Sequence, residues 1–217
     1  MVEISLPNGR WCVSETKDRI LAAATRRFAH SGFDGTSLSH IADDVGMRKP
    51  SLLYHFPSKE ALREAVLTQL LGQWQTRLPD ILARAHSVDD RFGALFDEVY
   101  DFFSIDPSRA LLVMREVVDR PAETRTRLSD AIRPWATIIA SSIAAEQHGG
   151  RVHRSVDPES YVVQSIVMMI GSVVAADFGA AVFGASAGPE WSDRQRSESR
   201  RIARFSLFQH PGEKNPS

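Results

Sequence analysis

The sequence predicts an all-α fold of about nine helices, from the spacing of its apolar residues and from the residues that separate the apolar stretches. Apolar side chains recur three or four positions apart along most of the 217-residue chain. Phe92, Phe96, Tyr100 and Phe103 follow this pattern in one such stretch. Glycine, proline and helix-capping residues stand between the stretches, as expected where helices begin and end. The length suffices for one large domain or two small ones with stable cores.

The net charge and the cysteine content of the chain limit the classes of protein to which it can belong. The formal net charge is −1 at pH 7, so any nucleic-acid binding must come from a local basic patch and not from a globally basic surface. The single cysteine, Cys12, cannot form an internal disulfide, which indicates a reducing, cytoplasmic location. No positively charged segment followed by an apolar run opens the chain, so no signal peptide is expected.

The first helix follows an N-terminal segment, residues 1–13, that has no helical period and is expected to be a flexible arm. This helix is predicted to begin at residue 14 or 15 and to end at Ser31, before Gly32. Its buried face includes Ile20 and Phe28. We expect it to brace the motif that follows.

Residues 37–56 are predicted to form two short helices joined by a glycine turn. The apolar face of the first consists of Leu38, Ile41, Ala42 and Val45. Ser37 precedes that face as an N-cap, and Gly46 follows it as a residue that adopts positive φ at low cost. The second helix spans residues 49–55 and tolerates Pro50 in its first turn. This pattern is a helix-turn-helix, whose second helix enters the major groove of DNA, and we expect residues 14–60 to form a three-helix DNA-binding domain.

The second helix of the motif directs hydrogen-bond donors away from its apolar side. The predicted DNA-contacting residues are Ser37, Arg48, Lys49, Pro50, Ser51, Tyr54, His55 and Lys59. Arginine and lysine donate to guanine edges or phosphates, and hydroxyl and imidazole groups donate to phosphate oxygens. Lys59 begins the next helix, whose free N–H groups attract phosphate, although it is equally consistent with a surface lysine. The alternative for the whole motif is a helical hairpin packed in a core.

Residues 17–62, including RILAAATRRFAHSGFDGTSLSHIADDVGMRKPSLLYHFPSKEAL, resemble the N-terminal domain of the TetR family of transcriptional regulators. The glycine turn, the YHF sequence and the following PSKEAL all lie in register with that family. Leu53 departs from it, because a DNA-contacting tyrosine usually stands there, and Arg48 replaces a small capping residue. The resemblance implies a larger C-terminal helical domain, residues 61–210, that binds a ligand and forms dimers.

Further helices are predicted along this C-terminal part. They span about residues 59–78, 92–103, 107–120, 122–148, 158–183 and 191–209, followed by a disordered tail at 211–217. Pro134 is expected to bend or break the helix that contains it. The final helix is expected to turn Ile202, Phe205 and Phe208 inward.

The stretch from Tyr161 to Ala176 has no charged residue, but it is shorter than the roughly 20 residues that span a bilayer. We therefore expect no membrane partner and a helix buried on two sides, against its own domain and against a second copy of the chain. By the resemblance, the last two helices form a dimer interface. The predicted interface residues are Gly171, Ala175, Gly179, Ile202 and Phe205.

A ligand pocket in the C-terminal domain is the second expectation that depends on the resemblance. The candidate ligand-binding residues are Trp74, Phe96, Tyr100, Phe103, Met114, Trp135 and Met169, because they are large, apolar and on helices that face a common interior. Their aromatic bias indicates an unidentified small apolar or aromatic effector. The alternative is that they form a filled core. No metal-ligand spacing, catalytic motif or cofactor motif is found, so no metal, cofactor or enzymatic activity is expected.

These observations together indicate a homodimeric, sequence-specific DNA-binding transcriptional regulator. By the resemblance, it is a repressor that a small-molecule effector releases from a palindromic operator on double-stranded DNA. One alternative is a dimeric DNA-binding adaptor or architectural protein without an effector. A small all-α enzyme is the third possibility.

Overall fold

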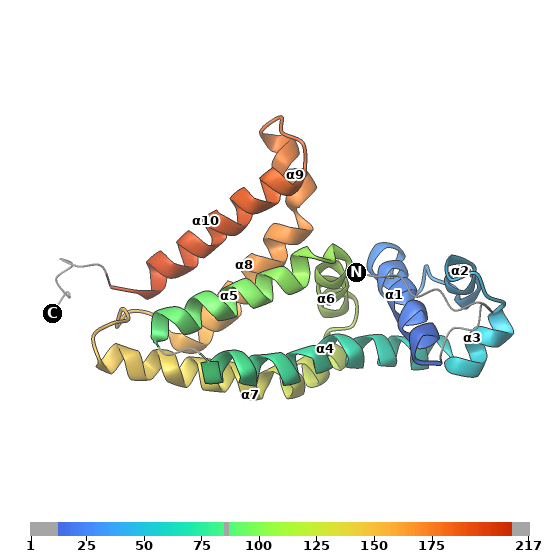
Figure 1. Cartoon of the computed structure of the whole chain (residues 1–217), viewed down its shortest axis with the longest axis horizontal. Coiled ribbons are helices and arrows are strands. Elements are labelled where there is room, and N and C mark those ends of the chain that lie inside the picture. Colours follow the sequence, from blue (N-terminus) through green and yellow to red (C-terminus); the bar gives the residue numbers. More distant parts are fainter. Residues whose placement is uncertain (1–12, 85–86, 210–217) are drawn as a thin grey trace. The chain divides into compact units, whose positions relative to one another are not determined.

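The computed structural model describes residues 13–84 and 87–209, and within these ranges it contains ten α-helices and no strand (Figure 1). The predicted all-α fold is confirmed for this part of the chain. The predicted tail at 211–217 and all of the predicted arm except Val13 lie outside the described residues. Contacts divide the chain into two compact units between Leu70 and Leu71, which is later than the boundary predicted after residue 60.

The first unit consists of three helices and the beginning of a fourth. These are α1 (Val13–Ser31), α2 (Leu38–Asp44), α3 (Lys49–His55) and the first turns of α4 (Lys59–Arg84). Each helix contributes a side chain with no exposed surface, namely Ile20, Ile41, Leu52 and Leu62. Helix α2 packs against both α1 and α3. The short helix α3 therefore rests on an apolar base that its own seven residues could not provide.

The turn between α2 and α3 depends on Gly46, whose φ is +69°. The Gly46 N–H donates to the carbonyl of Asp43 at 3.1 Å, and the Met47 N–H donates to that of Ala42 at 2.9 Å. These bonds satisfy carbonyls at the end of α2 while the chain reverses direction. Glycine is favoured here because a Cβ makes the left-handed conformation costly.

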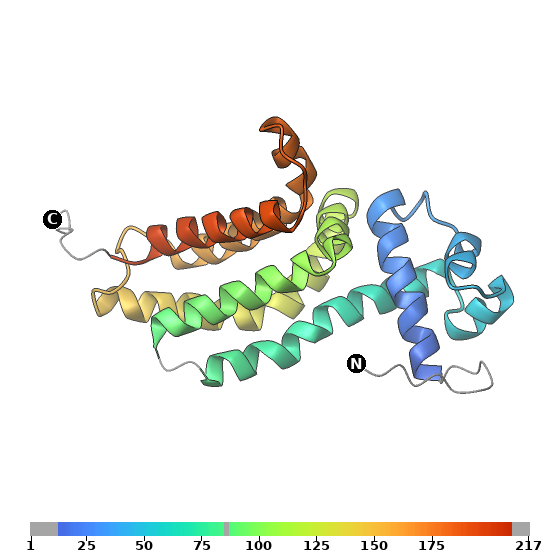
Figure 2. The same ribbon diagram turned by 45° about the horizontal axis from the view of Figure 1, so that its top comes forward.

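The second unit is built around α8. Its helices are α5 (Val88–Ser104), α6 (Pro107–Asp119), α7 (Pro121–His148), α8 (Pro158–Val174), α9 (Ala176–Val182) and α10 (Pro189–Leu207). Helix α8 contacts α5, α6, α7 and α10, and α10 returns along α8 (Figure 2). Within the described residues, no single helix is long and apolar enough to cross a membrane. Helices α8 and α9 reach that length and apolarity only as a pair, which is bent by 69°.

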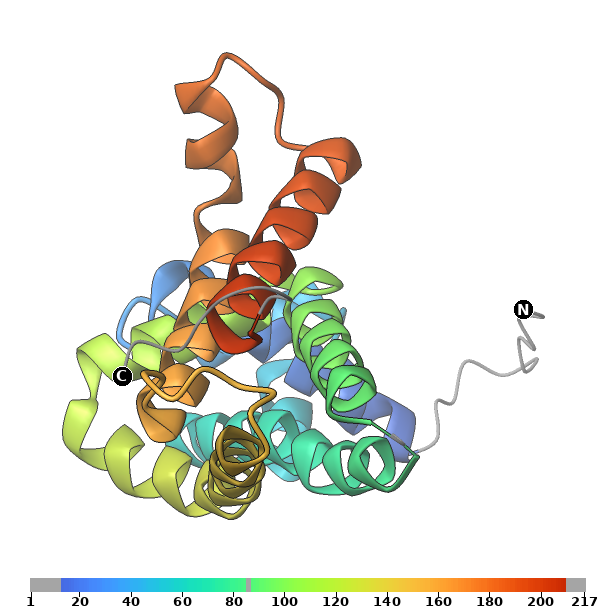
Figure 3. The ribbon, with the colours of Figure 1, turned by 90° about the vertical axis from the view of Figure 1, so that its left-hand side faces the viewer.

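The single helix predicted for residues 158–183 is wrong, because the chain breaks at Ala175 into α8 and α9. Figure 3 shows α9 and the start of α10 extending beyond the other helices of the second unit. The turn brings α9 against Trp191 of α10. A Cβ added at Gly179 would lie 3.3 Å from that indole ring. Gly179 therefore packs within its own chain, although it was assigned to the dimer interface.

Of the bend or break expected at Pro134, the break does not occur. Helix α7 runs without a break through this residue, which lies on its exposed side. The carbonyl of Asp130, which loses its N–H partner there, belongs to an exposed residue that water can reach. Helix α4 continues past the predicted end at Leu78 to Arg84.

Ion pairs join α10 to α5. Arg196 contacts Asp97 at 3.0 Å and Asp101 at 2.7 Å, Arg200 contacts Asp97 at 2.9 Å, and Arg204 pairs with Asp89. The aspartates of α5 lie beside these arginines, so three side chains of α10 are held in place by a neighbouring helix.

Replacing Gly46 with alanine is expected to lower the free energy of unfolding by about 1–2 kcal/mol, which is the cost of left-handed backbone for a residue with a Cβ. No atom lies within 4 Å of the position that this Cβ would occupy, so the backbone alone sets the cost. The measurement is urea unfolding followed by circular dichroism.

Gly72→Ala is the matched control. Gly72 lies inside α4 with equal space around it and without positive φ, so alanine there should stabilise the helix by about 0.5–1 kcal/mol. Equal effects of the two substitutions would show that Gly46 is not needed for its backbone conformation.

Candidate nucleic-acid interface and ligand cavity

The start of each motif helix is set by local hydrogen bonds. The Ser37 hydroxyl oxygen accepts from the His40 N–H at 3.1 Å and caps α2. Helix α3 begins with Lys49 and Pro50 and has no side-chain cap, since Arg48 stands at the N-cap position without such a bond. The missing proline N–H costs nothing in the first turn. The Arg48 side chain is therefore exposed and does not cap α3.

Helix α3 has one buried face and one exposed face. Leu52 has no exposed surface and Phe56 is 7 % exposed, whereas Tyr54 on the other face is 86 % exposed. The residues predicted to contact DNA that are exposed here are Arg48, Lys49, Pro50, Ser51 and Tyr54, while Ser37 and His55 are half-buried. Among the described residues, Arg48 and Lys49 have no ion pair and no side-chain hydrogen bond. The structure therefore brings most of the predicted contact residues together on one surface with their donors available; DNA contact by them stays a prediction.

Lys59 has a structural role that differs from the predicted phosphate contact. Its Nζ donates to the main-chain oxygens of Phe33 at 2.7 Å and Thr36 at 2.9 Å, and it lies 4.2 Å from the centroid of the Phe33 ring. Two of the three ammonium hydrogens are thus used within the protein. The ammonium holds the turn between α1 and α2, directly before the motif.

Two arginines of α1 fix the end of α2. The Arg27 guanidinium donates two hydrogen bonds of 2.6 Å to the Asp44 carboxylate, and it lowers the pKa of that carboxyl below its usual value. The Arg19 guanidinium donates to the Val45 carbonyl at 2.9 Å. Asp44 and Arg27 thus form a bidentate pair. These contacts position α2, and through the Gly46 turn they position α3.

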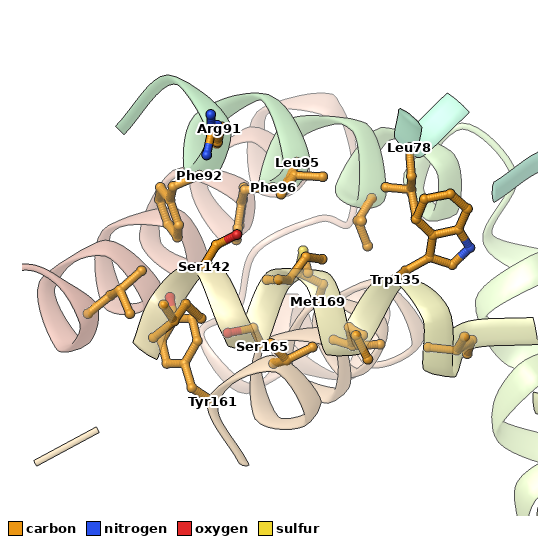
Figure 4. A pocket seen from close by; sticks show the side chains of 18 of the residues that line it. Leu78, Arg91, Phe92, Leu95, Phe96, Trp135, Ser142, Tyr161, Ser165 and Met169 are labelled. Carbon is orange, nitrogen blue, oxygen red and sulfur yellow. The ribbon is translucent and has the colours of Figure 1, made fainter. Parts of the chain in front are cut away.

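The second unit contains a cavity of about 190 Å³ between α5, α7 and α8. Leu78 of α4, labelled in Figure 4, and Leu207 of α10 also line it. Of the predicted ligand residues, those that line the cavity are Phe96, Phe103, Trp135 and Met169. The space is therefore open and the filled-core alternative does not describe it, although ligand binding stays a prediction.

Two predicted ligand residues, Tyr100 and Met114, are not among the described residues that line the cavity. Tyr100 is buried outside it, where its ring stacks on Phe96 at 6.0 Å and its hydroxyl donates to the Ser192 carbonyl at 3.4 Å. Met114 is half-buried on α6, and it is not among the residues that line the cavity. The Trp74 side chain lies outside the described part of the chain.

Four polar residues at the cavity were not predicted. They are Arg91, Ser142, Tyr161 and Ser165. The hydroxyl of Tyr161 donates to the Ala203 carbonyl at 2.8 Å, and burial raises the pKa of this phenol to about 12, so it is neutral at pH 7. Tyr161, Ser165 and Met169 lie four residues apart on one face of an apolar helix. That spacing in the sequence is the signal that would have identified them.

A set of exposed apolar residues lies on α8, α9 and α10. Its members are Val163, Val167, Val174, Phe178, Val182, Phe183, Ile202 and Phe205, which are 39–79 % exposed. The expectation that Ile202 and Phe205 turn inward is wrong within one chain, since they are 45 % and 58 % exposed. Gly171 is half-buried and Ala175 is exposed in the same region. Side chains of this size are seldom left exposed together unless a partner covers them.

Within the described residues, no group of three or more histidine, cysteine or acidic side chains is arranged to hold a metal ion.

Comparison with known proteins places the motif in a family. Residues 20–66 match the family described as "Bacterial regulatory proteins, tetR family". The regulator RutR of Escherichia coli is 53 % identical over 62 residues, which are 29 % of this chain and 29 % of that protein. The repressor KstR2 of Mycolicibacterium smegmatis is 30 % identical over 135 residues, 59 % of this chain and 65 % of that protein.

The likeness to solved structures extends over nearly the whole chain. The regulator KstR2 of Mycobacterium tuberculosis has a TM-score of 0.72 and 17 % identity, covering 93 % of this chain and 98 % of that one. A transcriptional regulator from Saccharomonospora viridis in complex with choline has a TM-score of 0.66 and 22 % identity, covering 91 % and 100 %. The fold and the exposed α3 define a helix-turn-helix protein with a helical second unit. Residues 20–66 are therefore similar to the DNA-binding domain of the TetR family of transcriptional regulators, and the chain shares its fold with the solved regulators.

Replacing Lys59 with methionine is expected to lower the free energy of unfolding by about 1.5–3 kcal/mol, because hydrogen bonds from a charged group to main-chain oxygens are lost. The matched control is Lys49→Met, at an exposed lysine, which should change stability by less than about 0.5 kcal/mol. Thermal unfolding measures both. Equal melting temperatures would mean that Lys59 does not hold the turn.

Proposed function

We propose that this protein is a sequence-specific DNA-binding transcriptional regulator that acts as a repressor. The observation that carries the proposal is the exposed face of α3, where donors surround Tyr54 above the fully buried Leu52. A helix of this kind in a helix-turn-helix enters the major groove and donates to base edges and phosphates. The names of similar proteins support the sign of regulation, since KstR2 is a transcriptional repressor and IcaR of Staphylococcus aureus a negative transcriptional regulator.

The first test is selection of random duplex DNA by the purified protein. Arg48→Ala and Lys49→Ala should each reduce affinity for the selected sequence by about 1–3 kcal/mol and relax base preference at one position if the side chain reads a base. Affinity should also fall steeply as salt rises, because phosphate contacts release counterions. The control is Arg154→Ala, an exposed arginine of the second unit, which should leave affinity unchanged. Unchanged affinity in both α3 variants would refute this assignment of the reading surface.

Two copies of the chain are proposed to act together on a palindromic operator. The exposed apolar surface of α8, α9 and α10 supports a symmetric interface in which the same surface meets its copy. A dimeric helix-turn-helix protein reads two half-sites about 34–36 Å apart, or a multiple of that distance. The interface would therefore set the spacing of the operator half-sites.

Val167→Asp is expected to convert the dimer to a monomer, because the proposed interface would bury a carboxylate without a partner. Sedimentation measures the mass, and operator affinity should fall together with it. Val118→Asp is the matched control, since Val118 is 70 % exposed on α6, away from the surface. If both variants sediment like the parent, the interface lies elsewhere.

A small molecule in the cavity of the second unit is proposed to release the repressor from DNA. The cavity supports this, and one structural neighbour was solved in complex with choline. A ligand shifts the equilibrium between the DNA-bound and DNA-free forms only as far as it binds the DNA-free form more tightly than the DNA-bound form. DNA must then weaken ligand binding by the same factor. An adaptor without an effector would show operator binding that no ligand changes, and no ligand would raise its melting temperature.

A further inference from the structure

The cavity has two chemically different ends. Figure 4 shows Arg91 and Phe92 at one end and Leu78 and Trp135 at the other. The wall between them consists mainly of apolar side chains, including Phe96, Ile139 and Met169. Among the described residues of the lining, Arg91 is the only charged one. A ligand that fills this space therefore meets a cation at one end and hydrocarbon along the rest of its length.

Arg91 lacks a counter-charge among the described residues. Its Nε is shielded from solvent and has no hydrogen-bond partner. The acidic residues beside it in the chain do not serve this purpose, since Asp89 pairs with Arg204 and Asp90 is exposed. The positions one helical turn away hold Ser87 and Leu95. A guanidinium that is partly removed from water without a partner is costly, and an anion beside it would offset that cost.

The hydroxyl groups of Tyr161, Ser142 and Ser165 also line the cavity, and each has a partner, which for Ser165 is the Tyr161 side chain. Tyr161 donates to the Ala203 carbonyl at 2.8 Å, and Ser142 donates to the Ile138 carbonyl at 2.9 Å. Arg91 is thus the group at this end with a donor that has no acceptor. A carboxylate fits this donor better than a neutral group does, because guanidinium and carboxylate form paired, charge-assisted hydrogen bonds.

The size of the space limits the ligand. An apolar cavity of about 150 Å³ in another protein holds benzene. This cavity, about 190 Å³, is somewhat larger and accommodates one ring with a short chain, or a medium-length alkyl chain. A ligand of this size must also place its polar group at the Arg91 end.

We propose that the cavity binds a small amphipathic carboxylic acid, with its hydrocarbon part between Phe96, Trp135 and Met169 and its carboxylate paired with Arg91. The role of this acid as the effector rests on the repressor function proposed above. Binding of the acid is independent of the repressor function, because the described lining residues all belong to the second unit and not to the helix-turn-helix.

The test compares acids with alcohols of the same skeleton. The probes are 4-phenylbutanoic acid with 4-phenyl-1-butanol, and octanoic acid with 1-octanol, titrated calorimetrically into the full-length protein at pH 7.5. In the parent protein we expect at least one acid to bind about tenfold tighter than its alcohol, which is the gain from one charge-assisted pair. No acid preference in either pair would overturn the proposal without the use of any variant.

Variants then locate the carboxylate. Arg91→Gln should remove the preference for the acid and leave alcohol binding unchanged, whereas Arg91→Lys should keep part of the preference. Arg154→Gln removes an equal charge from an exposed position and should change nothing. A preference for the acid that survives Arg91→Gln would overturn the assignment to Arg91.

The effector role is read separately, as release of selected operator DNA by the same acid. Acid binding that depends on Arg91 but does not release DNA supports the site and refutes the acid as effector. Failure to bind any DNA refutes the repressor function and leaves the calorimetric result intact.

Discussion

The apolar composition of α8 constrains the whole second unit. A helix with so few polar positions must be covered on nearly all sides, and its own chain supplies α5, α6, α7 and α10 as cover. This cover is incomplete in two places. On the inner side, the side chains of α5, α7 and α8 leave a cavity. On the outer side, Val163, Val167 and Val174 remain exposed beside Ile202 and Phe205. The proposed ligand site and the proposed dimer interface both arise from this one helix.

In the first unit, the seven-residue helix α3 must be held in place by its neighbours. Charged residues of the unit contribute to this. Arg19, Arg27 and Lys59 each bind a main-chain carbonyl or a carboxylate of the turns around α2. Arg48 and Lys49 have no such partner among the described residues. The unit therefore separates its cations into those that support the motif and those that are available to a nucleic acid.

The sequence predicted the helices well and their contacts less well, for physical reasons. Helix α3 could be predicted because its apolar positions, Pro50 and the preceding Gly46 are local signals. The break at Ala175 could not, since no proline or positive φ marks it, and the contact of Gly179 with Trp191 that follows it is set by tertiary structure. The partners of Lys59 and Asp44 are likewise set by tertiary structure. In the cavity, periodicity identified large residues on the correct helices but did not show that Tyr100 faces α10.

The place of Trp135 in the cavity has an optical consequence. Its indole is half-buried and lies at the apolar end of the cavity, near Leu78 (Figure 4). Trp191, in contrast, is buried against α9 and does not belong to the lining. The fluorescence of Trp135 is thus expected to change when a molecule fills the cavity, whereas that of Trp191 is not. Occupancy of the cavity could therefore be followed without an added label.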